Sequence, residues 1–270
     1  MKTRLVLISV ILISISEVLS GQGKSFTIIQ ITDPQLGAIR KNASFSDETV
    51  LFTKAVDKIN NLKPEYVIIT GDMVNDRKNQ EQWNEFFRIK NNIDPSIKIY
   101  YSPGNHDINE NPKKEDIAFF DSLFKNDRFS IKYGKYRFIG INSCLIKSSS
   151  PGLVDEQLNW LTSELKKSSK AKLTMIFTHY PLFIKDPEEA ENYSNIKPEI
   201  RKQYLELFSE YGVDVVFSGH LHYNAGGKYK ETEYIITSAV GRQNDAQSVP
   251  GMRLIKITGN SFTQEYVPLD

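Results

Sequence analysis

Side chains that can bind metal ions recur in five short segments of the sequence, each directly after an apolar run. In chain order these segments contain Asp33 and Gln35, then Asp72, then Asn105 with His106 and Asp107, then His179, and finally His220 and His222. All four histidines of the chain lie in these segments. Carboxylate and amide oxygens and imidazole nitrogens are the usual protein ligands of divalent cations. The set therefore predicts metal chemistry, provided that the five segments meet in space.

The elements that must position these residues alternate regularly along the chain. Short runs rich in β-branched residues predict strands at residues 26–31, 66–70, 97–101, 137–141, 173–177, 214–217 and 234–237. Apolar residues spaced three and four apart predict helices at residues 48–61, 79–91, 115–123, 155–168 and 199–211. The alternation predicts an α/β fold, a layered sandwich in which central β-sheets are flanked by helices.

The position of the polar segments gives a physical reason for them to meet. In open α/β sheets, ligands bind in the crevice outside the carboxyl ends of the strands. Each segment alone is weak evidence, since an Asp-Pro turn, a Gly-Asp pair or a single histidine more often serves local structure. Their order and their shared position after apolar runs favour one common site.

Length and composition fit one well-buried domain, which we expect over residues 21–270, with two small domains as the alternative. The 34 basic and 33 acidic residues nearly cancel, so no nucleic-acid binding surface is expected. Cys144 is the only cysteine, which excludes an intrachain disulfide. It lies in an apolar run, and we expect it to be a buried small side chain rather than a nucleophile.

The first twenty residues differ from the rest of the chain. Lys2 and Arg4 precede an apolar run at residues 5–15, and the small residues Ser20 and Gly21 follow. This pattern predicts a signal peptide over residues 1–20 and an exported protein, periplasmic or secreted; an uncleaved membrane anchor is the alternative. Cleavage would remove two of the 34 basic and one of the 33 acidic residues, leaving 32 of each, so no stable membrane association is expected afterwards.

The ordered set of motifs resembles that of the calcineurin-like metallophosphoesterases over nearly all of residues 21–270. The motifs that carry the resemblance are Asp33, Gly71-Asp72, Gly104-Asn105-His106-Asp107, His179 and Gly219-His220 with His222. Residues 32–37, 217–227, 236–242 and 250–254 look most like the subgroup of calcineurin-like phosphoesterase domain-containing protein 1, a serine/threonine phosphoprotein phosphatase. The resemblance implies the fold of that family, two divalent metal ions (Mn, Fe, Zn or Mg), and hydrolysis of phosphate esters by a metal-bridging hydroxide.

The resemblance also implies a role for each predicted metal ligand. Asp72 would bridge the two ions. The first ion would be completed by Asp33 and His222, and the second by Asn105, His179 and His220. Gln35 departs from the wider family pattern, which has histidine at this position. Its neutral amide oxygen suits Mn²⁺ or Mg²⁺ better than Zn²⁺, which favours Mn²⁺; whether Gln35 binds the ion or leaves room for water stays open.

Two further groups of residues have implied roles at the substrate. His106 would donate a proton or a hydrogen bond to the ester or phosphate, and Asp107 would orient His106. Asn224 and Arg242 are the preferred candidates for binding substrate, because the subgroup resemblance is densest around them. Weaker candidates are Tyr193, Arg201 and Arg253.

The implied activity is phosphomonoester hydrolysis, on a phosphorylated small molecule or on phosphoserine or phosphothreonine in a protein. A phosphodiesterase or nucleotide hydrolase is the enzymatic alternative. A metal-binding scaffold without catalytic activity is the non-enzymatic alternative. Gln35 is the residue that suggests it, because the wider family has a histidine at this position. Retention of His106 and Asp107 favours an enzyme, because a scaffold needs no proton donor beside its metals.

Overall fold

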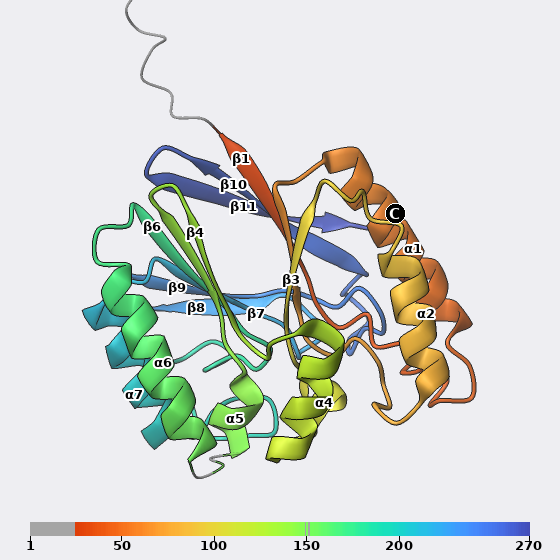
Figure 1. Ribbon diagram of the computed structural model, residues 1–270, viewed down its shortest axis with the longest axis horizontal. Helices are drawn as coiled ribbons and strands as arrows, with labels where there is room; N and C mark the ends of the chain where they lie inside the picture. Colours follow the sequence, from red (N-terminus) through yellow and green to blue (C-terminus); the bar gives the residue numbers. More distant parts are fainter. Residues whose placement is uncertain (1–24, 149, 151) are drawn as a thin grey trace, which may run out of the picture.

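The computed structural model describes residues 25–148, 150 and 152–270. Two β-sheets lie face to face in its middle, and helices cover their outer faces (Figure 1). The first sheet has the strand order β11-β10-β1-β2-β3, and the second has the order β4-β5-β6-β7-β9-β8. The prediction of a layered α/β sandwich is confirmed. The predicted signal peptide lies outside the described residues.

The first sheet is built by two crossover helices. Its parallel strands are β1 (Phe26–Ile31), β2 (Tyr66–Thr70) and β3 (Lys98–Ser102). Helix α1 (Ser46–Leu62) joins the first pair and helix α2 (Gln80–Lys90) joins the second, as parallel strands require. On the other side of β1, the hairpin of β10 (Gly251–Thr258) and β11 (Ser261–Pro268) adds antiparallel strands.

The second sheet has a parallel centre and antiparallel edges. Its parallel strands are β5 (Tyr136–Gly140), β6 (Leu173–Phe177), β7 (Val215–Ser218) and β9 (Thr232–Ile236). The edges are β4 (Phe129–Tyr133) and β8 (Ala225–Tyr229). The remaining helices are α3 (Asn105–Ile108), α4 (Lys114–Phe124), α5 (Ser143–Ser148), α6 (Leu153–Lys167) and α7 (Pro198–Glu210). Cys144 is buried in α5, as predicted, and burial raises the pKa of its thiol.

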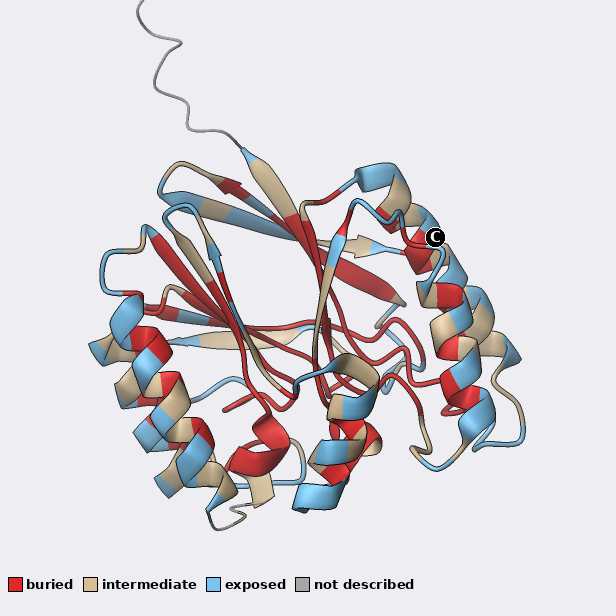
Figure 2. Ribbon diagram, in the orientation of Figure 1, coloured by how far each residue is buried: buried red, intermediate tan, exposed pale blue. Residues whose placement is uncertain are grey.

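The core consists of layers that follow from the alternation of side chains along each strand. Ile28 of β1 packs between the sheets with Phe177 and Phe217, whereas the next residue, Ile29, packs outward with Phe52 of α1. Figure 2 shows the buried residues concentrated in the sheets and on the inner faces of the helices. Strands buried on both faces are continuous apolar runs, which is why the sequence predicts them well.

A buried polar bridge joins the two sheets near the ends of their strands. The Gln30 Nε2 of β1 donates to Thr70 Oγ1 at 2.9 Å and to the carbonyl oxygen of Ser218, in the other sheet, at 3.2 Å. Thr237 Oγ1 donates to Gln30 Oε1 at 2.7 Å. Because buried amides lose stability when unpaired, this bridge fixes how the ends of β1, β2 and β7 face one another. The polar segments of the sequence begin at these ends.

Within the described part of the chain, no helix is both long and apolar enough to cross a membrane.

Candidate metal centre

Four of the predicted metal ligands meet beyond the ends of β2, β3, β6 and β7. Ligand atoms of Asp72, His179 and His220 all lie within 4.8 Å of one another, and all three residues are buried. The His179 Nε2 lies 3.1 Å from Asn105 Oδ1 and 3.4 Å from Asp72 Oδ2. The structure thus brings together the residues predicted for the second ion and the predicted bridging carboxylate.

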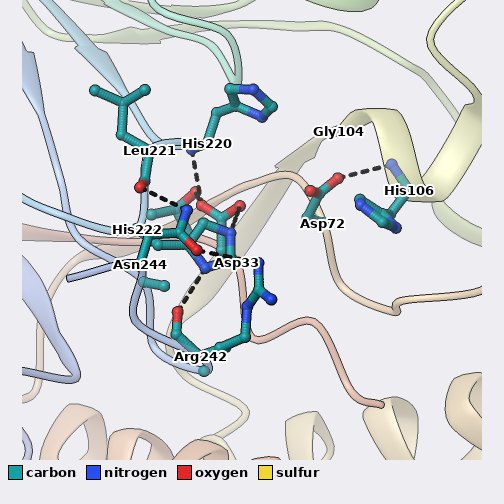
Figure 3. A network of polar contacts seen from close by, with 12 residues as sticks. Asp33, Asp72, Gly104, His106, His220, Leu221, His222, Arg242 and Asn244 are labelled. Atoms are coloured by element: carbon teal, nitrogen blue, oxygen red, sulfur yellow. Dashed lines mark hydrogen bonds and ion pairs between the residues drawn. The ribbon is translucent and has the colours of Figure 1, made fainter. Parts of the chain in front are cut away.

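The residues predicted for the first ion lie directly beside this group (Figure 3). The His222 Nε2 lies 3.3 Å from Asp33 Oδ1, and the backbone N–H of His220 donates to Asp33 Oδ2 at 3.0 Å. The backbone N–H of Gln35 donates to the carbonyl oxygen of Asp72 at 2.8 Å. Segments almost 190 residues apart in sequence therefore share one cluster.

The backbone at the cluster is strained. Five predicted ligands have a left-handed backbone, with φ values of 52° for Asp33, 39° for Gln35, 50° for Asp72, 70° for His220 and 58° for His222. This conformation costs a non-glycine residue about 1–3 kcal/mol, and such residues gather at functional sites. The strain turns the chain sharply at the end of each strand, so that the side chains face the cluster.

Two glycines let the segments approach each other closely. A Cβ on Gly219 would lie 1.9 Å from Thr32 Oγ1 and 2.7 Å from Asp33 Oδ2. A Cβ on Gly104 would lie 2.1 Å from Asp72 Oδ1. Both contacts are too short for any side chain, so each glycine is required for the position of a predicted carboxylate ligand.

Backbone carbonyl oxygens set the tautomer of two of the predicted histidine ligands. The Nδ1 of His179 lies 2.9 Å from the carbonyl oxygen of Thr70, and the Nδ1 of His222 contacts that of Arg242. A carbonyl oxygen only accepts, so each Nδ1 carries the hydrogen and donates it. The Nε2 atoms of these rings are then free to bind a cation, which is the usual arrangement of metal-binding histidines.

Unpaired buried atoms show that the cluster fits metal ions. Asp33 Oδ1, Gln35 Oε1 and His220 Nε2 are buried and have no hydrogen-bond partner among the described residues. A buried polar atom without a partner costs about 1–3 kcal/mol, and native proteins rarely leave several together. Divalent cations bound by these oxygens and nitrogens would supply the missing partner. The unpaired oxygen of Gln35 fits its predicted role as a ligand.

The electrostatics favour carboxylates that stay ionised. Burial alone would raise the pKa of Asp33 and Asp72, but the neighbouring histidines outweigh it, chiefly His222 for Asp33 and His179 for Asp72, and lower both values. Burial works against the charge on His179 too, yet Asp72 and Asp33 raise its pKa to about 9. Burial and the neighbouring His179 lower the pKa of His220 to about 3. The cluster is thus preorganised for positive charge beside its carboxylates.

The expected contact between Asp107 and His106 is absent from the described residues. Asp107 instead accepts hydrogen bonds from the backbone N–H groups of Met73 at 2.9 Å and Gly104 at 2.8 Å. The His106 Nδ1 donates to the carbonyl oxygen of Asn75 at 2.7 Å. The expectation was wrong because neighbouring residues of a helix do not face each other. Asp107 therefore ties together two loops that carry predicted ligands, and burial raises its pKa to about 7.

A pocket of about 470 Å³ opens beside the cluster. It is lined by Asn105, His106, Asn109, Glu110, Asn111 and Tyr193. The Tyr193 hydroxyl lies 3.5 Å from Asn105 Nδ2, and its ring centroid lies 5.3 Å from that of His220. A larger cavity, of about 820 Å³ between β3, β4 and α6, contains no predicted site residue. Proximity to the cluster, rather than size, thus identifies the pocket that a substrate would enter.

The two preferred substrate-binding candidates differ in their surroundings. Arg242 is exposed; its carbonyl oxygen contacts His222, and one guanidinium nitrogen, Nη2, donates to Asn244 Oδ1 at 3.0 Å (Figure 3). Asn224 is exposed too, but its Oδ1 accepts hydrogen bonds from Arg253 Nη2 at 2.6 Å and from the backbone N–H of Ser238 at 3.2 Å. The structure therefore supports Arg242 better than Asn224 as a substrate contact.

Two of the weaker candidates are structural residues. Arg201 is buried, and its guanidinium donates only to backbone carbonyl oxygens, those of Leu182, Pro187, Glu189 and Ile196. Arg253 is also buried and donates to Asn224, Gln264, Thr237 and the carbonyl oxygen of Ile236. Neither guanidinium contacts the cluster, so the structure favours the structural role over contact with a substrate for both. Sequence alone gives no sign that a charged residue is buried against carbonyl groups.

Sequence reasoning missed residues that support the site. The carbonyl oxygen of Asn75 holds His106, and Gln82 Oε1 accepts from the backbone N–H groups of Asn75 at 3.1 Å and Asp76 at 2.8 Å. Gln82 lies in α2 and is fully buried. Its one visible signal is a polar residue on the inner face of an amphipathic helix. Glu110 was missed too, since its proximity to the cluster depends on the turn after α3.

Comparison with known proteins places the chain in a family. A family model described as calcineurin-like phosphoesterase matches residues 26–224. Serine/threonine-protein phosphatase CPPED1 of Bos taurus is 32% identical over 264 residues, which cover 91% of this chain and 84% of that protein.

Two solved structures share the fold. A purple acid phosphatase, PPD1 from yellow lupin, has a TM-score of 0.68 at 15% identity and covers 92% of this chain; this chain spans 52% of the lupin chain. A dimetal phosphatase from Danio rerio has a TM-score of 0.60 at 14% identity, covering 91% of this chain and 99% of that chain. The family model and the bovine relative extend well beyond the cluster. The chain therefore belongs to the calcineurin-like phosphoesterase family.

Proposed function

We propose that this metal-dependent phosphoesterase removes single phosphate groups from phosphoserine or phosphothreonine in proteins or peptides. The similarity to serine/threonine-protein phosphatase CPPED1 over most of both chains supports this choice of substrate. The observation that carries the proposal is the meeting of the two predicted ligand groups around unpaired buried atoms of Asp33, Gln35 and His220.

The ligand groups suit two cations held on either side of Asp72. Asp33, Gln35 and His222 would hold one, and the other would be held by Asn105, His179 and His220. Two divalent cations, when bound, neutralise the phosphate and lower the pKa of water towards about 7. We infer Mn²⁺ as the preferred ion, because Gln35 adds a neutral oxygen where an imidazole would favour Zn²⁺.

The chain's own residues orient the substrate and move the proton. The Nδ1–H of His106 donates to the carbonyl oxygen of Asn75, which leaves Nε2 as the ring nitrogen available to a substrate. The ring lines the pocket beside Asn105. His106 can hold a proton at Nε2 for the leaving oxygen, a step worth about 10²–10⁴-fold. The exposed guanidinium of Arg242, a residue whose carbonyl oxygen contacts His222, can bind phosphate oxygens.

Steady-state assays of the purified chain with Mn²⁺ test this function. We expect it to hydrolyse p-nitrophenyl phosphate and phosphoserine and phosphothreonine peptides in preference to bis(p-nitrophenyl) phosphate. Asp72→Ala or His220→Ala should abolish turnover together with metal binding. His106→Ala should slow turnover with both metals retained. Asp57→Ala, which removes an exposed carboxylate on α1, is the matched control and should change neither.

Two outcomes would replace the proposal. Preference for the diester would favour the phosphodiesterase alternative. Binding of two metals without turnover of any ester would favour the non-catalytic scaffold.

We also infer that the protein is exported, to the periplasm or the medium. The support is the basic start, short apolar run and small residues of positions 1–20. Fractionation of expressing cells, with mass measurement of the N-terminus, tests this. Retention in the cytoplasm with an intact residue 1 would contradict it.

A further inference from the structure

The pocket beside the cluster is bordered by one negative charge. Of the residues that line it, Glu110 is the only carboxylate, and none is a lysine or an arginine. Glu110 is exposed and makes no ion pair among the described residues. Its charge therefore acts on whatever enters the pocket.

The pocket lies where the group attached to the phosphate would extend. It shares Asn105 with the metal cluster and contains His106, the proposed proton donor to the leaving oxygen. Tyr193 also lines it, with its ring beside His220. A phosphate bound at the cluster would therefore direct its leaving group past His106 towards Tyr193 and Glu110.

Two positive charges behind the walls are already paired with groups of the chain. Arg77 lies 2.8 Å from Asp116, and Asp116 also accepts from Asn109 in the pocket wall. Lys147 donates at 2.7 Å to the carbonyl oxygens of both Asn192 and Asn195, on either side of Tyr193. These cations stabilise the walls and do not face the pocket. A second anionic group of a substrate would find no lysine or arginine among the residues that line the pocket.

The walls are also held in place, so that Glu110 and Tyr193 stay close to each other. Asn109 donates its backbone N–H to the carbonyl oxygen of Asn105 at 2.9 Å and has φ 84°, which turns the chain toward Glu110. Arg201 holds the loop that leads to Tyr193 through several carbonyl oxygens. Burial and the nearby Glu110 carboxylate raise the pKa of Tyr193 to about 12, so the phenol keeps its proton as a hydrogen-bond donor.

We propose that Glu110, together with Tyr193, selects phosphomonoesters whose leaving group is cationic or neutral. For a phosphopeptide this means a preference for arginine or lysine beside the phosphorylated residue over aspartate or glutamate. This inference rests on the proposed phosphomonoesterase function and narrows its substrates. Nucleoside polyphosphates and doubly phosphorylated esters are disfavoured, because they place a second anion beside Glu110.

The test compares two phosphoserine peptides that differ only in having arginine or glutamate at the positions next to the phosphoserine. Exposed ion pairs contribute about 0.2–1 kcal/mol. We therefore expect kcat/KM to favour the arginine peptide by about 1.4- to 5-fold per pair, and the ratio to fall as salt screens the charges. Glu110→Gln should bring the ratio close to one, and Glu110→Lys should invert it.

Two controls separate this role from a general change in charge or fold. Glu115→Gln removes an exposed carboxylate of α4 that does not line the pocket, and it should leave the ratio as in the wild type. Turnover of p-nitrophenyl phosphate by Glu115→Gln should also match the wild type.

The other outcomes distinguish a failure of the role of Glu110 from a failure of the proposed phosphatase function. A wild-type ratio of one, or a ratio unchanged in Glu110→Gln while both peptides are hydrolysed, overturns the role of Glu110 and leaves the proposed phosphatase function intact. No turnover of either peptide or of p-nitrophenyl phosphate overturns that function and this inference with it.

Discussion

The substitution Gly219→Ala tests whether the close packing of two segments holds a metal ligand in place. The added Cβ would lie 1.9 Å from Thr32 Oγ1 and 2.7 Å from Asp33 Oδ2. Ordinary contacts begin near 3.4 Å, so the Thr32 hydroxyl must retreat by about 1.5 Å. Thr32 donates to Asp33 Oδ2 at 2.5 Å, and therefore the carboxylate must move with it.

The expected loss follows from that displacement. A misplacement of about 1 Å at a reacting centre costs on the order of 10²-fold in rate. Overpacking of a dense core costs about 1–3 kcal/mol of unfolding free energy. We therefore expect Gly219→Ala to lower kcat/KM by about 10²-fold or more and to weaken metal binding at Asp33, in a chain that still folds.

Gly140→Ala is a matched control. Its Cβ would lie 2.1 Å from Cε1 of Phe129, between β5 and β4, and its three nearest atoms all belong to that ring. The stability cost should be similar, but the activity of the folded protein should not change. Thermal unfolding, metal content and p-nitrophenyl phosphate kinetics of both variants and the wild type complete the assay. If Gly219→Ala matched Gly140→Ala in kcat/KM and metal content, the reasoning would be refuted.

Three further predictions concern the residues around the cluster. Gln82→Leu removes the acceptor that holds the loop at Asn75, so the His106 ring loses its alignment. We expect kcat to fall by about 10- to 100-fold, while elemental analysis still finds both metal ions. An unchanged kcat would contradict this role of Gln82. Gln35→His should tighten metal binding in competition titrations, because imidazole is the stronger donor; unchanged or weaker affinity would count against Gln35 as a ligand. In the metal-free protein the pKa of His179 is raised to about 9, so a metal ion must displace a proton from this ring at neutral pH. Calorimetry should therefore show that the affinity for the metal ion rises between pH 7 and 9. An affinity that does not change with pH would argue against metal binding at His179.

The parts of the fold that the sequence predicts best are the strands that are fully buried, because burial alone requires apolar residues there. β2 and β6 are buried along their whole length, so their sequences are mostly apolar. The hairpin of β10 and β11 was not predicted, because β11 is half-exposed and polar residues interrupt its pattern. A half-exposed edge strand needs few apolar residues, so the same residues are equally compatible with a turn or a loop.

The same distinction holds for the site. Residue types and order predicted which side chains gather, since carboxylates and histidines placed after strands have few other reasons to recur. The partner of each side chain was not predictable. The Asn75 carbonyl oxygen that holds His106 belongs to a backbone group that every residue has, and its position depends on the path of the loop. The error for Asp107 has the same origin, because nearness in sequence does not imply facing side chains.

The most direct test of the central claim is anomalous diffraction from crystals of the chain grown with Mn²⁺. We expect two manganese ions about 3.5–4 Å apart on either side of Asp72. One should contact Asp33 and His222, and the other should contact His179. A single ion, or two ions bound away from Asp72, would show that these residues do not form a two-metal centre.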